Sequence, residues 1–227
     1  MTNVIIIVDG PPASGKSTIV MFLAKKLSHK VYTFKRLGLI NLYAEFLLHI
    51  TPSVGIHGNG ERPEGFKVLQ VLKHHRRDPV LLINSRFLER TAFTVFLLEV
   101  VYKCLRFLHL IVSALTYRCI IVDEWFSLEW ANYYNLMFYK KAFKPRHVEV
   151  LMRLDISLLR FLSRIKNVHV YFIDRNWKRL ALFWRRRGHV THYDIKYATL
   201  VKYFFNLFTY TCREQKIDIE IKHLHLP

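Results

Sequence analysis

The chain has 227 residues, 52% of them apolar, and carries 35 lysines and arginines against 17 acidic residues, a formal net charge of +18. This length and apolar content predict one folded domain over residues 1–227 and exclude a disordered chain. The positive charge predicts an anionic partner, either a nucleotide, a nucleic acid or an anionic membrane face. A basic proteome or simple solubility would also explain the surplus.

Three scattered cysteines, Cys104, Cys119 and Cys212, form no CxxC or Cys/His metal-binding pattern. An odd, scattered set is typical of a reducing compartment, so we predict a cytoplasmic protein. The sequence runs directly into an apolar strand-like segment, and we therefore expect no secretory or transit segment.

The first motif along the chain is Gly10–Thr18, which reads GPPASGKST and fits G-x-x-x-x-G-K-[ST]. It predicts a phosphate-binding loop in which Lys16 holds the β- and γ-phosphates and the Ser17 hydroxyl reaches Mg²⁺. Gly10 and Gly15 allow a backbone that a Cβ would obstruct. The predicted nucleotide-binding residues are Gly10, Pro11, Pro12, Ala13, Ser14, Gly15, Lys16, Ser17 and Thr18.

The neighbours of this loop supply the context that the motif needs. The apolar run Asn3–Val8 is typical of a strand buried on both faces, and Thr18–Leu27 has apolar residues at helical spacing. A chance match in an ordinary loop would lack both. Asp9, one residue before the loop, either lies near the metal or caps backbone groups, and the sequence leaves these roles open.

Strand-like runs separated by helical material predict βαβ units. We expect a three-layer α/β fold with a five-stranded parallel sheet and helices on both faces. The runs are Asn3–Val8, Lys30–Phe34, Arg118–Asp123, Val168–Ile173 and Lys216–Ile221. The predicted helices are Thr18–Leu27, Leu39–Ile50, Phe66–His75, Ser85–Leu115 (one helix or two), Glu149–Ile165 and Tyr193–Glu214, with a polar loop over Thr51–Gly65.

Basic residues between the second and third runs are candidates for binding an acceptor. Lys35 and Arg36 follow the second run, and Arg90 and Lys103 lie in the helical region beyond it. No Asp or Glu lies between residues 27 and 43, where a nucleoside kinase would need a base for a hydroxyl. The pattern therefore favours a phosphate acceptor, whose oxygen needs no deprotonation.

The segment Ala92–Leu115 is the most apolar long stretch. Its charged or titratable members Glu99, Lys103, Arg106 and His109 argue against a membrane span. Because the segment is apolar nearly all round, we expect a central helix or a subunit interface, and hence a homodimer as a hypothesis.

The third run ends in Asp123 and Glu124. In proteins with this phosphate loop, an acid at the tip of a neighbouring strand holds the Mg²⁺. We predict Ser17 and Asp123 as metal ligands and Glu124 as a base or an outer metal neighbour. The alternative is a strand that ends in solvated acids.

An arginine-rich segment at about 174–192 follows the fourth run, and residues 174–213 hold nine lysines and arginines against two acids. Positioned guanidinium groups stabilise the charge that develops on a moving phosphoryl group. The segment therefore predicts a lid over the nucleotide. A solvated basic helix face is the alternative. The candidates are Arg175, Arg179, Arg185, Arg186 and Arg187.

Together these segments resemble the thymidylate kinase family of P-loop nucleotide kinases. Val8–Thr18 is similar to the family's phosphate loop, and Ile121–Trp125 to its strand that ends in Asp-Arg-aromatic. Phe96–Leu115 is similar to its long helix, and Asp174–Gly188 to the segment that leads into its arginine-bearing lid. The resemblance implies a P-loop NTPase fold and ATP-dependent phosphoryl transfer with Mg²⁺.

The departures concern the residues that would contact the acceptor. Glu124 replaces the family's Arg, Lys103 replaces an Arg, and Lys35–Gly38 lacks the Glu-Pro of the family's Arg-Glu-Pro-Gly segment. The resemblance therefore supports phosphoryl transfer better than it supports thymidylate. The family includes divergent archaeal members that act on other small metabolites.

The sequence thus predicts an ATP-dependent kinase for a small phosphorylated acceptor, with a nucleoside monophosphate as first choice. Two alternatives stay open. One is a kinase for a nucleoside or a non-nucleotide metabolite, with Glu124 as base. The other is a nucleic-acid-associated ATPase or polynucleotide kinase, suggested by the net charge and by the aromatic and basic segment Phe138–Lys144.

Overall fold

The computed structural model describes residues 4–27, 30–33, 38–50, 80, 83–186 and 195–226. The chain divides into two compact units. Unit 1 comprises Met1–Phe34, Leu105–Asn132 and Met152–Pro227, and unit 2 comprises Lys35–Cys104 and Tyr133–Leu151. The predicted loop Thr51–Gly65 and the predicted helix Phe66–His75 lie outside the described residues.

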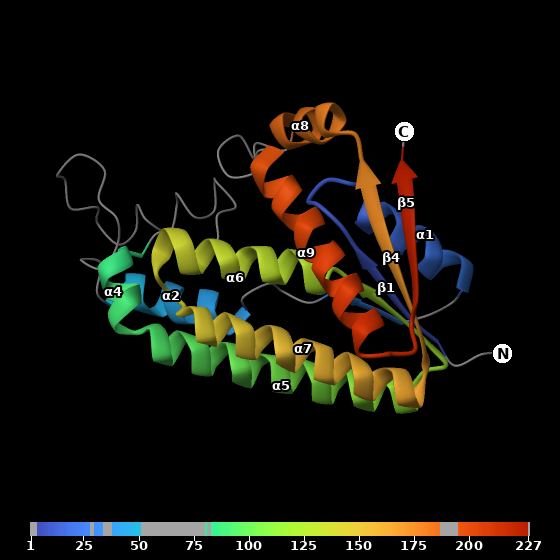
Figure 1. Ribbon diagram of the computed structural model, residues 1–227, viewed down its shortest axis with the longest axis horizontal. Coiled ribbons are helices and arrows are strands. Elements are labelled where there is room, and N and C mark those ends of the chain that lie inside the picture. Colours follow the sequence, from blue (N-terminus) through green and yellow to red (C-terminus); the bar gives the residue numbers. More distant parts are fainter. Residues whose placement is uncertain are drawn as a thin grey trace. The chain divides into compact units, whose positions relative to one another are not determined.

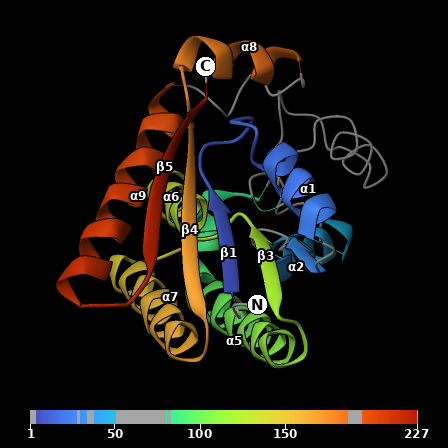
Figure 2. The same cartoon turned by 90° about the vertical axis from the view of Figure 1, so that its right-hand side faces the viewer.

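Unit 1 is built on a sheet whose paired strands are all parallel (Figures 1 and 2). Parallel strands buried on both faces need continuous apolar runs, and the first and third strands of the sequence have them. In their order across the sheet, the strands are β2 (Lys30–Thr33), β3 (Cys119–Asp123), β1 (Val4–Asp9), β4 (Asn167–Arg175) and β5 (Glu220–Leu226).

Helices cover both faces of this sheet. On one face, Val20 of α1 (Lys16–Leu27) packs with Ile173 of β4. On the other face, Phe172 of β4 stacks on Phe205 of α9 (Ile195–Glu214), with ring centroids 4.1 Å apart. Because successive strand residues point to opposite faces, these two contacts define a three-layer arrangement. The predicted α/β architecture with a parallel sheet is confirmed.

The predicted fifth strand, Lys216–Ile221, was misplaced, because β5 begins only at Glu220. Lys216 has φ 50° and stops α9. The N–H groups of Lys216 and Ile217 donate to the carbonyls of Arg213 and Cys212, both at 3.0 Å, which is the bonding pattern of a helix stop that usually has glycine. Lys216 and Ile217 therefore belong to the helix stop and not to the strand.

Unit 2 contains α2 (Gly38–Ile50) and α4 (Ser85–Arg90). The predicted helix Ser85–Leu115 is two helices, α4 and α5 (Ala92–Thr116). Asn84 caps α4, accepting a hydrogen bond from the Arg86 N–H at 2.9 Å. The helices α5, α6 (Phe126–Lys140) and α7 (Pro145–Ile165) each contribute residues to both units.

The expectation that Ala92–Leu115 is apolar nearly all round was wrong, because α5 has a polar face and an apolar face. Glu99, Lys103 and Arg106, at helical spacings of four and three, are 1%, 2% and 7% exposed. The outward face has no Asp, Glu, Lys or Arg. Besides exposed His109, it carries the large apolar side chains Phe93, Leu97, Val101, Leu105, Leu108, Val112 and Leu115. The charges turn inward because they find partners there.

Helix α6 was not predicted. Its residues 126–131 are all buried, so its sequence shows no alternation between an apolar and a polar face. Trp130 in this stretch donates a hydrogen bond to Asp155 of α7 at 2.8 Å. Among the described residues, no helix is long and apolar enough to cross a membrane.

Candidate functional site

The candidate site begins with the loop between β1 and α1. Gly10 has φ +140°, and a Cβ on this residue would lie 2.3 Å from the carbonyl oxygen of Ile173. Gly15 has φ +104°. Both positions need glycine, as the sequence motif predicted, because L side chains rarely adopt such backbone angles. The loop therefore has the tight backbone of a phosphate-binding loop.

Lys16 is 3% exposed and lies under this loop. Its ammonium nitrogen Nζ is 2.8 Å from the Gly10 carbonyl oxygen and 2.7 Å from that of Pro11. The third neighbour is Glu124, whose Oε1 is 3.1 Å away. The Lys16 ammonium thus has three oxygen neighbours.

Ser17 and Asp123 form the second contact of the site. The Ser17 hydroxyl donates to Asp123 Oδ2 at 3.2 Å. Asp123 reaches this position because it ends β3, where it pairs in register with Val8 of β1. A hydroxyl and a carboxylate side by side are hard oxygen ligands of the kind that Mg²⁺ takes, together with phosphates and water. The residues present therefore fit the predicted Mg²⁺.

Glu124 lies at the turn between β3 and α6. Its φ is 66°, an unusual value for a residue with a long side chain, and its N–H donates to the Val8 carbonyl at 2.9 Å. This turn aims the carboxylate at Lys16. The structure thus brings together four predicted residues, Lys16, Ser17, Asp123 and Glu124, at the carboxyl ends of β1 and β3.

Asp9 is fully buried directly before the loop. Its Oδ1 accepts from the Gly10 N–H and its Oδ2 from the Ser127 N–H, both at 2.8 Å. Burial raises the pKa of Asp9 above its ordinary value, while the two hydrogen bonds and the charge of Lys16 act in the opposite direction. Of the two roles left open, backbone capping is the one observed. Ser127 had no sequence signal, because it belongs to the unpredicted α6.

A buried ion pair near Trp125, the residue after Glu124, was also missed. Arg106 bonds to Glu129, and its guanidinium lies 5.9 Å from the centroid of the Trp125 ring. The signal was available in the spacing of Glu99, Lys103 and Arg106, which places all three on one helix face.

The predicted arginine-rich lid corresponds to the end of β4, helix α8 (Trp177–Arg186) and the residues that follow. Arg175 lies over the Phe183 ring, 5.2 Å from its centroid, and Arg179 is exposed on α8. The side chains of Arg185 and Arg186 and all of Arg187 lie outside the described part of the chain.

A cavity of about 380 Å³ adjoins the phosphate loop. One of its lining residues, Leu226, has its Cδ1 3.3 Å from the position that a Cβ of Gly15 would take. Within the lining, Lys202 Nζ bonds Asp174 Oδ1 at 2.8 Å. The lining residues are Asp174, Arg175, Asn176, Trp177, Lys202, His225 and Leu226. Of these, Lys202, His225 and Leu226 were not predicted, since nothing in the sequence links them to the loop.

The acceptor candidates belong to unit 2 and are described only in part. Lys103 is buried with its Nζ 5.1 Å from the centroid of the Tyr133 ring, and the Tyr133 hydroxyl donates to Glu99 at 2.6 Å. Arg90 is exposed in the last turn of α4, where a cation suits the helix dipole. Lys35 and Arg36 lie outside the described residues.

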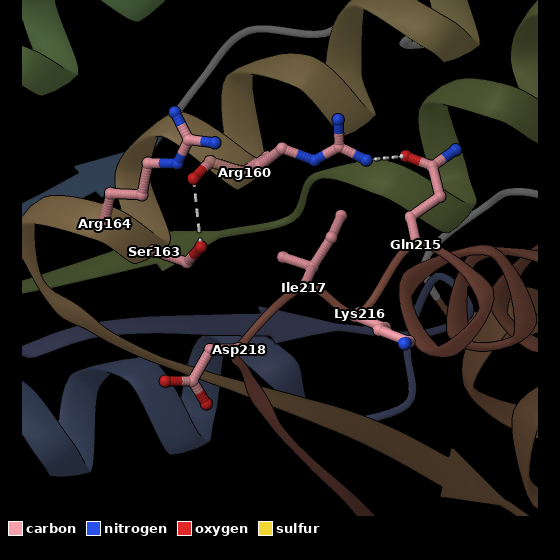
Figure 3. A pocket seen from close by; sticks show the side chains of 7 residues that line it. All are labelled: Arg160, Ser163, Arg164, Gln215, Lys216, Ile217 and Asp218. Carbon is pink, nitrogen blue, oxygen red and sulfur yellow. Dashed lines mark hydrogen bonds between the residues drawn. The ribbon is translucent and has the colours of Figure 1, made fainter.

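A second cavity, of about 530 Å³, lies between the end of α7 and the turn after α9, at the amino ends of β4 and β5. Figure 3 shows that the charged ends of its three cations, Arg160, Arg164 and Lys216, lie apart from one another. Arg160 bonds Gln215. These cations do not converge on one ligand, so we leave this cavity out of the candidate site.

Comparisons with known proteins give structural likenesses only. Neither a scan of family models nor a search of curated proteins finds a match. Among solved structures, deoxyadenosine kinase from M. mycoides with dCMP and dCDP bound is 14% identical, covers 97% of this chain and 89% of its own, and has a TM-score of 0.49. The same enzyme with dATP bound is 14% identical, covers 96% of this chain and 89% of its own, and has a TM-score of 0.48. Thymidylate kinase from Candida albicans is 12% identical, covers 99% of this chain and 84% of its own, and has a TM-score of 0.41. At these identities and scores, the functional assignment depends on the residues of the site.

Proposed function

We propose that this protein is a P-loop phosphotransferase that passes the γ-phosphoryl group of ATP to a small acceptor. The observation that carries the proposal is the convergence of Lys16, Ser17, Asp123 and Glu124 beside a loop that requires glycine at Gly10. Nucleoside triphosphates are bound by this kind of arrangement, in which a glycine-containing loop is combined with a buried lysine and a hydroxyl–carboxylate pair.

Each residue of this set has a task in the transfer. The loop and Lys16 bind the β- and γ-phosphates and hold them in line for attack. Ser17 and Asp123 hold Mg²⁺, which neutralises phosphate charge when bound. Arg175 and Arg179, with Arg185, Arg186 and Arg187, stabilise charge on the moving phosphoryl oxygens. The cavity that contains Trp177 has room beside Gly15 for the base and sugar of the donor.

The acceptor in this proposal is small and phosphorylated, with a nucleoside monophosphate as first choice. Lys35, Arg36, Arg90 and Lys103 supply the positive charge for its phosphate. Lys103 is buried beside Tyr133, so its ammonium lies in the interior of unit 2 rather than on a solvated surface.

The test is a titration of nucleoside monophosphates, nucleosides and sugar phosphates with Mg²⁺ and ATP, following ADP release. We expect a nucleoside monophosphate to raise the rate most. A higher rate with hydroxyl acceptors would favour the alternative with Glu124 as base. No stimulation by any small acceptor would remove the kinase assignment.

A nucleic-acid-dependent ATPase is the second candidate, favoured by the net charge and by exposed aromatic and basic groups at the end of α6. Phe138 and Tyr139 are 58% and 76% exposed, and Lys141 and Lys144 are exposed beside them. Filter binding over a salt series would support this candidate if RNA or DNA affinity fell steeply with salt and nucleic acid stimulated ATP hydrolysis.

We also propose that the protein is a homodimer through the apolar outward face of α5. In unit 1 this face presents Leu105, Leu108, Val112 and Leu115 at heptad spacing. A two-fold contact would bury these side chains without bringing like charges together, which matters in a chain of net charge +18.

Light scattering tests the dimer. The double substitution Leu108→Lys and Val112→Lys should halve the mass. Tyr139→Lys, which places the same charge on an exposed aromatic elsewhere, should not change it. A monomeric wild-type protein would contradict the proposal.

A further inference from the structure

The three donors of the Lys16 ammonium are matched by three acceptors. A lysine ammonium has three N–H groups. Two of the acceptors, the carbonyls of Gly10 and Pro11, belong to the loop backbone itself. The third acceptor is the carboxylate of Glu124. A phosphate that approaches Lys16 can keep the two backbone contacts, but it must replace Glu124.

Glu124 is placed for this contact at a conformational cost. A residue with a long side chain at φ 66° carries backbone strain of about 1 kcal/mol or more, and such strain collects at functional sites. The side chain is 20% exposed, so it has room to turn away from Lys16. The contact is therefore both specific and breakable.

The formal charge around the loop makes the exchange unfavourable for a bare polyphosphate. Three carboxyl groups lie at or beside the loop: Glu124 contacts the Lys16 ammonium, Asp123 contacts Ser17, and Asp9 directly precedes Gly10. A phosphate group that displaces Glu124 leaves this carboxylate beside further anions at short range. A divalent cation held at Ser17 and Asp123 offsets that repulsion.

We propose that Glu124 is a specificity-determining residue that makes nucleotide binding depend on a divalent cation. Its carboxylate accepts the Lys16 donor that a bound phosphate would need. When a nucleotide binds without a cation, its phosphates repel the displaced Glu124 carboxylate. When a divalent cation accompanies the nucleotide, the cation attracts that carboxylate instead. This inference depends on the proposed function, because it assumes that the loop binds a nucleoside triphosphate.

The experiment compares the dissociation constant of ATP in Mg²⁺ with that in EDTA, by calorimetry. In Glu124→Gln, we expect ATP to bind about tenfold more tightly than to wild type in EDTA, and no more tightly in Mg²⁺. The ratio of the two constants should therefore shrink about tenfold or more.

Two further variants control the result. Glu124→Asn tolerates φ 66° but is too short to reach Lys16, so it should repeat the effect even if Glu124→Gln folds poorly. Glu214→Gln makes the same change of charge at an exposed position at the end of α9 and should leave the ratio unchanged.

The outcomes distinguish the two levels of the proposal. If wild type binds ATP and both Glu124 variants keep the wild-type ratio, the inference is overturned while the proposed function stands. If wild type binds no ATP under either condition, or if Lys16→Ala binds ATP as wild type does, both are overturned.

Discussion

The two ends of the sheet in unit 1 both carry a cavity and a non-glycine residue with positive φ, yet only one end has the makings of a catalytic site. At the carboxyl ends, Glu124 with φ 66° directs its carboxylate at buried Lys16. At the amino ends, Lys216 with φ 50° completes a helix stop, and the guanidinium groups of Arg160 and Arg164, which line the same cavity, lie apart (Figure 3). The second cavity is the larger and the more cationic. Convergence of buried polar groups therefore identifies the site better than volume or charge does.

The largest expected effect comes from removing the lysine on which the first end converges. Lys16→Ala should lower turnover at least about a thousandfold, since it removes charge stabilisation from the transferring phosphoryl group. Arg160→Ala, which deletes a cation at the other end, should leave turnover unchanged. Steady-state kinetics on both variants, with circular dichroism to confirm folding, checks the contrast. Activity that survives in Lys16→Ala would break the comparison between the two ends.

The next effect concerns the backbone of the loop and distinguishes its two glycines. Gly10→Ala would push a Cβ to 2.3 Å from the rigid Ile173 carbonyl, and should lower the free energy of unfolding by about 3 kcal/mol. Gly15→Ala meets only the end of the Leu226 side chain, at 3.3 Å, and should cost less. Urea denaturation measures both. Equal losses would mean that strain at positive φ, rather than the close approach, sets the cost.

These contrasts also mark what the sequence could predict. The spacing of Gly10, Gly15, Lys16 and Ser17 is local, so one stretch of sequence predicts the loop and its glycine backbone. Asp123 was predictable because parallel strands bring their carboxyl ends to one edge. The contact between Lys16 and Glu124 joins residues more than a hundred positions apart through a turn with positive φ, and no local pattern encodes it.

The helical layer shows a different limit. Residues 126–131 of helix α6 are all buried, so this stretch has no amphipathic period. The Ser127 N–H that binds Asp9 lies in this stretch and was therefore not predictable. The spacing of Glu99, Lys103 and Arg106 places all three on one face of α5. That face was overlooked because most residues of the segment are apolar. The direction in which that face turns depends on partners such as Glu129, which only the folded chain reveals.

A smaller effect on turnover is expected from substituting Asp9, which joins the phosphate loop to α6 by hydrogen bonds from Gly10 and Ser127. Asp9→Asn replaces one accepting oxygen by an NH₂ group facing a backbone N–H, and should lower turnover about tenfold by loosening Gly10. Because burial raises the pKa of Asp9, the folded wild-type protein holds this proton more tightly than the unfolded chain does. The stabilisation is complete at low pH and is lost as pH rises from about 4 upward.

The stability of wild type relative to Asp9→Asn should therefore be greater at about pH 4 than at about pH 7. Chemical denaturation at both pH values measures this difference. Asp218→Asn, at the other end of the sheet, is the matched control and should affect neither turnover nor the loop. A relative stability that grows with pH would show that the hydrogen bonds outweigh the burial of the carboxyl group.

The smallest effect comes from substituting glycine for Lys216 and for Glu124, two of the residues with positive φ, and it compares the two ends most directly. Lys216→Gly should raise the free energy of unfolding by about 0.5 kcal/mol, because glycine relieves the strain of the helix stop at a small entropic cost. Nucleotide affinity should not change. Glu124→Gly relieves the same kind of strain, but it also frees the third donor of Lys16, so it should alter nucleotide affinity in EDTA. Thermal unfolding and calorimetry on Lys216→Gly and Glu124→Gly would show whether the positive φ affects only stability at Lys216 and also nucleotide affinity at Glu124. A change of nucleotide affinity in Lys216→Gly would mean that the two ends are coupled.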